Sequence, residues 1–261
     1  GSSHFHYEHG SPVEPLWKVL AMQHSAKRTL PSASTIHGGL LLTGPPGIGK
    51  STACRRVAEQ CAANGWRVEG FITEELRGQK GSRIGFDLVG LGTLEGQRTA
   101  LARLAGPQDA RRVGRYGVQV AEFESMAFQI MDHVLSLQAD SERVIFICDE
   151  IGKMELFSKG FVDRARELMR RRHVPVLFTI ALRGGGFIAE AKTCPGFTLL
   201  EIAEATRDGV PSQIYEELCC QPQPVFDSSA AAGPPTRWRS VKAGNESDER
   251  EDEAAVASRG A

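Results

Sequence analysis

Apolar residues recur along the chain in short runs, and the runs become regular from Gly38 onward. Uninterrupted apolar runs are typical of strands that are buried on both faces of a parallel sheet. We predict such strands at Gly39–Thr43, Val144–Cys148 and Val174–Ile180. Shorter or more mixed runs predict further strands at Arg67–Thr73, Arg83–Leu91, Gln97–Leu101, Val113–Val120 and Phe197–Ile202.

Amphipathic stretches lie between these strands. In Glu122–Leu137 the apolar residues recur at three- and four-residue steps, which is the period of a helix with one buried face. Further helices are predicted at Thr52–Ala63, Phe161–Arg172 and Pro211–Cys219. The polar link Gly78–Ser82 joins two predicted strands and indicates a β-hairpin. The alternation of strands and helices indicates an α/β sandwich with a mainly parallel sheet and a hairpin insertion.

A glycine-rich loop follows the first predicted strand. Residues Gly44-Pro45-Pro46-Gly47-Ile48-Gly49-Lys50-Ser51 match the phosphate-loop pattern G-x-x-x-x-G-K-[ST] at every fixed position. Glycine lets backbone N–H groups turn inward to form an anion site, and the N-terminus of the next helix adds partial positive charge. Lys50 can then reach the β- and γ-phosphates, and the Ser51 hydroxyl can bind Mg²⁺. The flanking strand and helix favour this interpretation over a chance glycine-rich turn.

A pair of acidic residues follows the apolar run Val144–Cys148. A side chain at the end of a central parallel strand emerges at the carboxyl edge of the sheet, where open α/β folds bind ligands. We therefore predict that Asp149 lies beside the phosphate loop as the Mg²⁺-side carboxylate, together with Ser51. Glu150 is predicted to orient or deprotonate the attacking water. The alternative is that the pair only caps the segment that follows.

Other polar residues near predicted strand ends are weaker candidates. Thr179 either hydrogen-bonds the water or the γ-phosphate, or is simply a buried threonine. Glu74 and Glu75 face either the site or solvent. Arg112 or Arg115 is a candidate for a charge-neutralising arginine supplied in cis, although exposed arginines are common on any protein.

Composition narrows the classes of partner. The chain has 261 residues, of which 41% are hydrophobic and 24% charged, as in a soluble globular protein. The net charge of -1 gives no electrostatic basis for binding nucleic acid or an anionic membrane, and no apolar run approaches the ~18 residues of a membrane span. Arg170-Arg171-Arg172 is better explained as the cationic end of a helix than as a nucleic-acid patch. The scattered cysteines are typical of reduced thiols in an intracellular protein.

The two ends of the chain differ from its patterned middle. Residues 1–37 form an N-terminal extension that begins with Gly1-Ser2-Ser3 and nearby histidines, which resembles a tag remnant. Within it, Leu16–Lys27 is either a short amphipathic helix or part of a targeting segment. Residues 221–261 form a tail that is rich in Pro, Ala and acidic residues, and we expect it to be disordered. The predicted phosphate-loop domain spans residues 38–220.

The acidic pair opens a segment that resembles the signature of the cancer-related nucleoside-triphosphatase family, Asp149-Glu150-Ile151-Gly152-Lys153-Met154-Glu155-Leu156-Phe157-Ser158. Further segments resemble the same family in the same order, namely Thr43–Lys50, Gly70–Glu75, Arg83–Asp87 and Arg112–Tyr116. Several segments in register are more specific than one motif. The loop Ala181–Gly186 departs from the proline-containing loop expected there, and neither terminal extension is covered by the resemblance.

The resemblance implies a RecA-like, three-layer P-loop fold and slow Mg²⁺-dependent hydrolysis of ATP, GTP, CTP and UTP to the diphosphate and phosphate. Carried onto this chain, Lys50 and Glu150 are the catalytic residues, and Ser51 and Asp149 bind the metal. The nucleotide-contacting set is Gly44, Pro45, Pro46, Gly47, Ile48, Gly49, Lys50, Ser51, Thr52, Asp149, Glu150, Ile151 and Gly152. We expect a cytoplasmic monomer, with organellar targeting left open, whose partners are nucleoside triphosphates rather than nucleic acid or membrane.

Two other functions share the same loop. A nucleotide or small-molecule kinase also needs an acceptor pocket and an arginine-bearing lid, and only Arg98–Arg115 is a candidate for that lid. A non-catalytic switch or a ring-forming ATPase motor is less favoured, because a motor carries a further helical domain after its core and little chain separates Thr179 from the predicted tail. Base selectivity is not readable, since no base-specific motif accompanies the loop.

Overall fold

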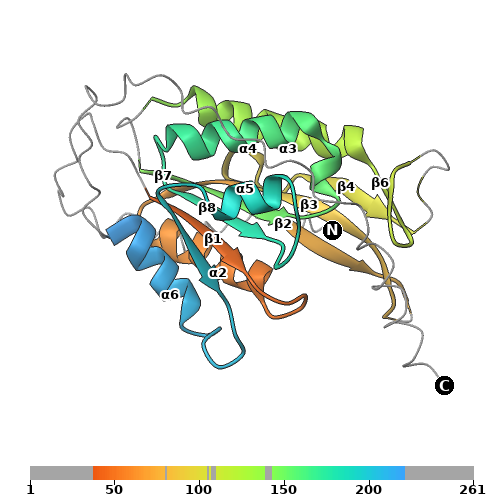
Figure 1. Cartoon of the computed structure of the whole chain (residues 1–261), viewed down its shortest axis with the longest axis horizontal. Coiled ribbons are helices and arrows are strands. Elements are labelled where there is room, and N and C mark those ends of the chain that lie inside the picture. The colour runs from red at the N-terminus through yellow and green to blue at the C-terminus, as the bar shows by residue number, and fades with distance from the viewer. Residues whose placement is uncertain (1–37, 80, 105, 107–109, 139–142, 221–261) are drawn as a thin grey trace, which may run out of the picture.

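The computed structural model describes residues 38–79, 81–104, 106, 110–138 and 143–220. The predictions for residues 1–37 and for the tail 221–261 lie outside the described residues. Within the described part, a single nine-stranded sheet is covered by helices on both faces (Figure 1). This is the three-layer α/β architecture that the alternation of strands and helices predicts.

The sheet has a parallel half and an antiparallel half. In sheet order its strands are β5 (Arg112–Val113), β6 (Tyr116–Val118), β4 (Arg98–Arg103), β3 (Arg83–Leu91), β2 (Arg67–Arg77), β7 (Val144–Ile151), β8 (Val176–Ile180), β1 (Gly39–Thr43) and β9 (Phe197–Glu201). The strands from β2 to β9 pair in parallel, and those from β5 to β2 pair antiparallel. One strand, β8, therefore separates β1 from β7, an order typical of RecA-like P-loop proteins.

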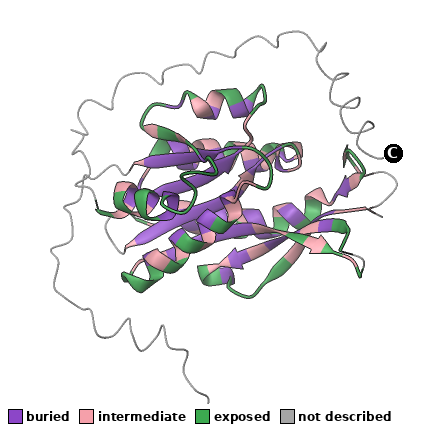
Figure 2. Cartoon of the chain, turned by 90° about the horizontal axis from the view of Figure 1, so that it is seen from below, coloured by how far each residue is buried: buried purple, intermediate pink, exposed green. Residues whose placement is uncertain are grey.

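Helices bury one apolar stripe each against the sheet. On one face lie α2 (Lys50–Ala63) and α6 (Val210–Tyr215), and on the other lie α3 (Val120–Ser136), α4 (Lys159–Arg171) and α5 (Phe187–Lys192). The strands contribute alternate residues to the two sides, since Leu41 belongs to the apolar core on the side of α3, α4 and α5, while Leu40 and Leu42 belong to the core on the side of α2 and α6. Figure 2 shows the buried residues concentrated in the central strands.

Several local predictions differ from the structure. The segment Val113–Val120 is not one strand, because a turn at Gly114, with φ of 55°, divides it into β5 and β6 and α3 already begins at Val120. Helix α5 follows the loop Ala181–Gly186 and was not predicted. The strand predicted at Arg67–Thr73 continues to Arg77, because its second half pairs antiparallel with β3 and forms the predicted hairpin.

Helix α4 begins and ends with specific caps. The Ser158 side chain accepts a hydrogen bond of 3.0 Å from the backbone N–H of Phe161, so the helix begins at Lys159 rather than at Phe161. At the other end Arg170 pairs with Glu167 at 2.6 Å, and Arg172 adopts a left-handed conformation with φ of 45°. Arg170 and Arg172 therefore contribute to the end of α4, where the helix dipole favours cations.

The six cysteines are all free thiols, and Cys54, Cys61, Cys148 and Cys194 are buried. Burial raises the pKa of the Cys54 and Cys148 thiols well above their ordinary value, which keeps them in the unreactive protonated form.

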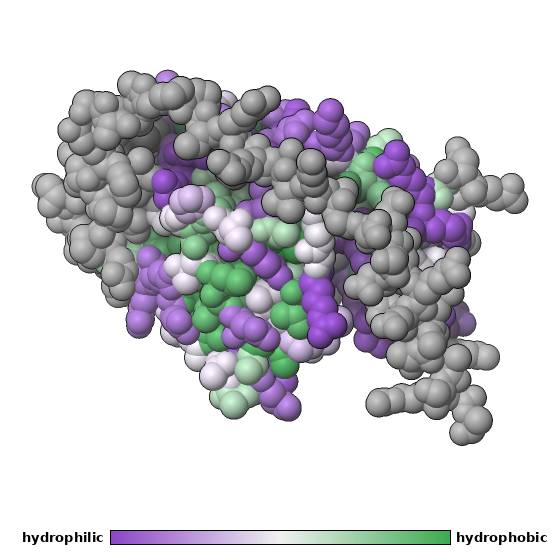
Figure 3. Space-filling view, viewed as in Figure 1, coloured by the Kyte–Doolittle hydropathy of each residue, from purple (hydrophilic) through white to green (hydrophobic). Residues whose placement is uncertain are grey.

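No helix in the described ranges has the length and apolar character needed to span a membrane. Apolar side chains gather on the face drawn in Figure 3 in the part of the view where Figure 1 labels β1, with polar residues among them.

Candidate active site

The phosphate loop starts from a strand that is buried along its whole length. All five residues of β1 are buried, and β8 and β9 pair with it on either side. The hydroxyl of Thr43, the last residue of β1, donates a 3.0 Å hydrogen bond to the carbonyl oxygen of Ile180 at the end of β8. The end of β1, from which the loop starts, is therefore fixed to the end of the neighbouring strand β8.

The loop itself has the geometry of an anion site. Gly47 and Gly49 have φ of 75° and 115°, conformations that glycine adopts readily, and α2 begins directly after them. The first-turn N–H groups of α2 have no acceptor within the helix, so they point toward the loop with the positive end of the helix dipole. The Lys50 Nζ donates to the carbonyl oxygens of Gly44 and Pro45 at 3.1 and 3.3 Å. Lys50 therefore lies over the loop, where an anion would bind.

Asp149 is the most tightly held carboxylate of the site. It is 1% exposed, and its Oδ1 accepts a 2.6 Å hydrogen bond from the Thr179 hydroxyl. The Thr73 backbone N–H approaches its Oδ2 at 3.4 Å, and the Ser51 side chain also hydrogen-bonds it. Burial raises the pKa of Asp149, although these hydrogen bonds and the charge of Lys50 oppose the rise. A second cation beside this carboxyl group, in addition to Lys50, would favour the ionised form of Asp149.

A β-bulge brings the two acidic residues to the same place. Cys148 pairs with Phe178 and Ile151 with Ile180, so Asp149 and Glu150 together oppose Thr179 alone. The peptide bond between the two acidic residues is cis. In a regular strand neighbouring side chains point to opposite faces, but here the positive charge of Lys50 acts on both carboxylates. The predicted pair therefore lies beside the phosphate loop.

Glu150 differs from Asp149 in its surroundings. Burial raises its pKa, the nearby Lys50 lowers it and the charge of Asp149 raises it further, with a net rise. The side chain is half-buried and no hydrogen bond fixes its carboxylate in the described part of the chain. A carboxylate with a raised pKa and free oxygens is suited to accept a proton from water.

Ser51 and Asp149 fit a magnesium ion. A hydroxyl and a carboxylate are hard oxygen donors, and Mg²⁺ in nucleotide sites uses one or two carboxylates together with substrate phosphates. The two side chains already contact each other. No cluster of three or more His, Cys, Asp or Glu that could hold a metal occurs among the residues described, and a site completed by phosphates does not require one.

A family model described as NTPase matches residues 39–215, which is more than half of the chain. The chain belongs to this NTPase family. The nucleoside-triphosphatase THEP1 of Aquifex aeolicus is 35% identical over 181 residues, which covers 69% of this chain and 98% of that relative. The cancer-related nucleoside-triphosphatase of Homo sapiens is 41% identical over 150 residues, which covers 56% of this chain and 76% of that relative.

The crystal structure of THEP1 from Aquifex aeolicus is similar to this fold, with a TM-score of 0.62 at 34% identity over 69% of this chain and 99% of that chain. The resemblance that the motifs indicate and the predicted P-loop fold are thus confirmed. The prediction that the chain is an enzyme of the nucleoside-triphosphate hydrolase class is confirmed at the level of its NTPase family.

Within this NTPase site, sequence reasoning missed the role of Glu155. This residue lies in a 3₁₀ turn at Glu155–Phe157, is buried, and accepts a 3.0 Å hydrogen bond from the Gly152 backbone N–H. Burial, and then the charge of Glu150, raise the pKa of Glu155 to about 8. A side chain at Gly152 would lie 3.1 Å from a Glu155 oxygen and 3.2 Å from a Glu150 oxygen, so the glycine lets both carboxyl groups approach. The available signal was a charged residue between the apolar Met154 and Leu156.

The weaker candidates from the sequence, the polar residues near strand ends and the two arginines, differ in what they contact. Thr179 is fully buried and donates to Asp149, so it orients that carboxylate. Glu74 forms ion pairs with Arg55 of α2 and Arg98 of β4, while Glu75 pairs with Arg77 and Arg83 on the hairpin. The structure does not bring Arg112 or Arg115 to the loop, because they lie in the β5–β6 turn at the opposite end of the sheet order and bond to nearby backbone and Tyr116.

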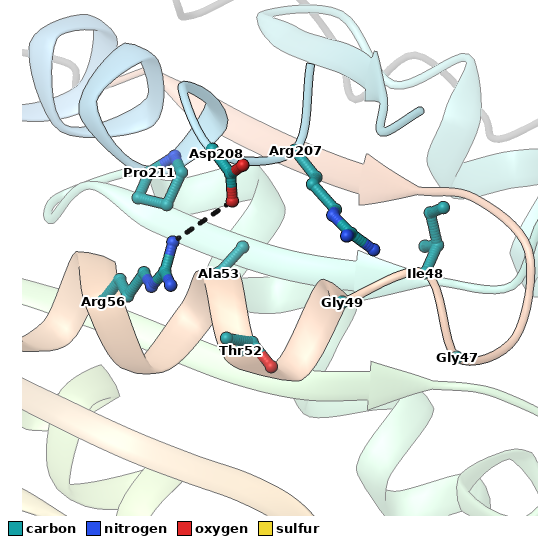
Figure 4. A pocket seen from close by; sticks show the side chains of 9 residues that line it. All are labelled: Gly47, Ile48, Gly49, Thr52, Ala53, Arg56, Arg207, Asp208 and Pro211. Atoms are coloured by element: carbon teal, nitrogen blue, oxygen red, sulfur yellow. Dashed lines mark ion pairs between the residues drawn. The ribbon is translucent and has the colours of Figure 1, made fainter. Parts of the chain in front are cut away.

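A pocket of about 310 Å³ opens beside the phosphate loop of this NTPase (Figure 4). Its lining comprises Gly47, Ile48 and Gly49 of the loop, Thr52, Ala53 and Arg56 of α2, Arg207 and Asp208 of the segment between β9 and α6, and Pro211 in the first turn of α6. The sequence motif identifies only its loop side and Thr52. The residues after β9 could not be found, because no pattern in the sequence links them to the loop.

Proposed function

We propose that this protein hydrolyses nucleoside triphosphates, namely ATP, GTP, CTP and UTP, to the diphosphate and phosphate in a Mg²⁺-dependent reaction. The observation that supports this most is the bulge in β7, where two adjacent carboxylates both lie within the influence of the positive charge of Lys50. One carboxylate is fully held by hydrogen bonds and the other is free to bind water. This division suits a metal anchor and a water-positioning base.

The residues of the loop would bind and orient the phosphate chain. Lys50 would exchange its bonds to the carbonyls of Gly44 and Pro45 for phosphate oxygens, and the first-turn N–H groups of α2 would bind others. Ser51 and Asp149 would hold Mg²⁺, which when bound neutralises charge on the phosphates. Thr179 and Thr73 keep Asp149 in place through the hydrogen bonds that they donate.

Glu150 would act on the attacking water. The water oxygen forms a bond to the γ-phosphorus while the bond from that phosphorus to the β–γ bridging oxygen breaks. The proton of the water passes to the Glu150 carboxylate, and the leaving diphosphate takes the electron pair of the broken bond. The raised pKa of Glu150 brings its proton affinity closer to that needed at neutral pH.

Substitution of Glu150 tests the proposal. Glu150→Gln keeps the shape but cannot accept the proton, so phosphate release should fall by about 10²- to 10⁴-fold, while ADP binding is retained. The matched control is Glu75→Gln, which removes a carboxylate that pairs only with Arg77 and Arg83 on the hairpin and should leave turnover unchanged. Unchanged turnover in Glu150→Gln, measured with each nucleotide with and without Mg²⁺, would refute the assignment.

The same assay separates hydrolysis from phosphoryl transfer. A kinase would consume nucleotide only when a nucleoside, nucleotide or other acceptor is added, whereas a hydrolase releases phosphate without one. Action as a monomer, without nucleic acid or membrane partner and in the cytoplasm, stays a prediction. The division into a domain at 38–220 and two extensions also stays a prediction.

A further inference from the structure

The pocket beside the loop lies on the side away from the reacting groups. Gly47 to Gly49 and the first turns of α2 line it, but none of Lys50, Asp149 and Glu150 does. Because the loop backbone binds the α- and β-phosphates, a triphosphate whose γ-phosphate is next to Glu150 would extend along the loop and away from the acidic pair. The nucleoside, at the other end of the phosphate chain, is then the part of the substrate nearest to this pocket. Its volume of about 310 Å³ is at the lower end of the range for small-ligand sites.

The walls of the pocket offer a flat cation and apolar surface. Figure 4 shows the Arg207 side chain reaching from the segment after β9 toward Ile48 of the loop. Its guanidinium forms no ion pair or hydrogen bond with any residue in the described ranges. Ile48 and Pro211 add apolar surface. A guanidinium plane stacks on the face of any aromatic ring system, and nucleobases have such faces.

The second arginine of the pocket is already engaged. Arg56 of α2 forms an ion pair of 3.7 Å with Asp208, and the dashed line in Figure 4 shows this pair at the far rim from Ile48. Both side chains are largely exposed, so the pair is worth little energy, but it satisfies one cation and leaves Arg207 as the available one. The lining contains no buried polar side chain that could distinguish one base from another through hydrogen bonds to the edge of the base.

We propose that this pocket holds the nucleoside of the substrate, with Arg207 stacked on the face of the base. This inference rests on the proposed function only in taking the phosphate loop as a nucleotide site. Recognition through the base face gives purines an advantage over pyrimidines, since they offer more stacking area, but it does not distinguish adenine from guanine.

The test compares ligands that share their phosphates and differ in the nucleoside. ADP and inorganic pyrophosphate, each with Mg²⁺, are titrated by calorimetry into the wild type, Arg207→Ala and Arg207→Lys. Loss of the stacking plane in Arg207→Ala should weaken ADP binding by about tenfold, or ~1.4 kcal/mol, and leave pyrophosphate binding unchanged. Arg207→Lys keeps the charge without the plane and should lose most of the same affinity. The control Arg170→Ala removes an arginine of α4, which covers the other face of the sheet, and should change neither ligand.

Each other outcome overturns the proposal. Equal weakening of ADP and pyrophosphate in Arg207→Ala, rescued by lysine, would show that Arg207 attracts phosphates by charge. Unchanged ADP binding would place the nucleoside elsewhere. A single diphosphate that binds far more tightly than the others in a series of ADP, GDP, CDP and UDP would show edge recognition instead of stacking. None of these measurements needs hydrolysis, so a wild type that binds ADP but releases no phosphate would refute the proposed function alone.

Discussion

The two sides of the phosphate loop hold their charges in opposite ways. On the side of the acidic pair, Asp149 is 1% exposed and Lys50 is 8% exposed, and both are fixed by hydrogen bonds. On the side of the pocket, the side chains of Arg56 and Asp208 are 53% and 87% exposed and meet at 3.7 Å. The first set has been removed from water, whereas the second remains in it.

This difference has an energetic meaning. A buried charge carries a desolvation cost of several kcal/mol, which is tolerated only where hydrogen bonds and an opposite charge compensate it. An exposed pair contributes about 0–1 kcal/mol and can change without harm to the fold. The buried side therefore needs a fixed set of residues to fold, while the exposed pair of Arg56 and Asp208 can change with little effect on stability. Substitutions on the buried side should therefore reduce turnover strongly.

The largest effect is expected for Asp149→Asn. Loss of the carboxylate charge removes the proposed anchor for Mg²⁺, and phosphate release should fall on the order of 10²-fold or more. Without Mg²⁺, the free energy of unfolding should fall, because the amide nitrogen cannot accept the hydrogen bond that the replaced oxygen receives and Lys50 loses a nearby opposite charge. Steady-state kinetics and urea unfolding in EDTA measure the two effects. Turnover like that of the wild type would contradict the separation of a buried catalytic side.

A smaller effect is expected for Thr179→Val. The substitution removes the 2.6 Å hydrogen bond to Oδ1 of Asp149 and leaves that carboxylate less well oriented. Loss of a hydrogen-bond partner of a metal ligand typically lowers metal affinity or activity by about 10- to 100-fold. Turnover should therefore fall by about tenfold, and the Mg²⁺ concentration needed for half-maximal turnover should rise by about tenfold. The control Thr193→Val removes an exposed hydroxyl that, directly after α5, donates to the carbonyl oxygens of Ala189 and Glu190. Equal effects from the two variants would show that the bond to Asp149 does not matter.

The smallest effect is on stability and concerns Glu155. Because its pKa rises from the ordinary value of 4.5 to about 8 on folding, the folded protein keeps a proton that the unfolded chain releases between these values. The free energy of unfolding should therefore fall as the pH rises through this window, and become independent of this group above about pH 8. Glu155→Gln removes this contribution, so its stability relative to the wild type should increase from pH 6 to pH 8.

Urea unfolding in EDTA at pH 6, 7 and 8 measures this trend. The control Glu167→Gln removes an exposed carboxylate whose pKa is lowered, mainly by the hydrogen bond from Arg170, so its effect should be the same at all three pH values. A constant difference between Glu155→Gln and the wild type would mean that the buried carboxyl is compensated in a way that the contacts do not reveal.

The sequence predicts best what is local. The fold class follows from alternating strands and helices, and the phosphate loop from fixed spacing between glycines and Lys50. The position of Asp149 and Glu150 follows from the end of an apolar strand, and the structure brings both to the loop. Their roles in the reaction stay predictions until turnover is measured.

What the sequence misses depends on contacts between distant segments. Arg207 reaches the loop because β9 lies beside β1, which no local pattern reveals. The burial of Glu155 results from packing of the turn after β7, and its position between two apolar residues is only a weak local signal of that burial. The error at Val113–Val120 is of another kind, since alternating residues around Gly114 fit one strand as well as two short ones with a turn between them.

The anchoring of β1 has a consequence for substrate binding. Since Thr43 is tied to Ile180 and the whole strand is paired on both sides, the start of the loop is already ordered before any phosphate arrives. The conformational entropy of this segment is lost when the protein folds, so binding does not have to supply it again. Such preorganisation leaves more of the intrinsic attraction between backbone N–H groups and phosphate available as affinity.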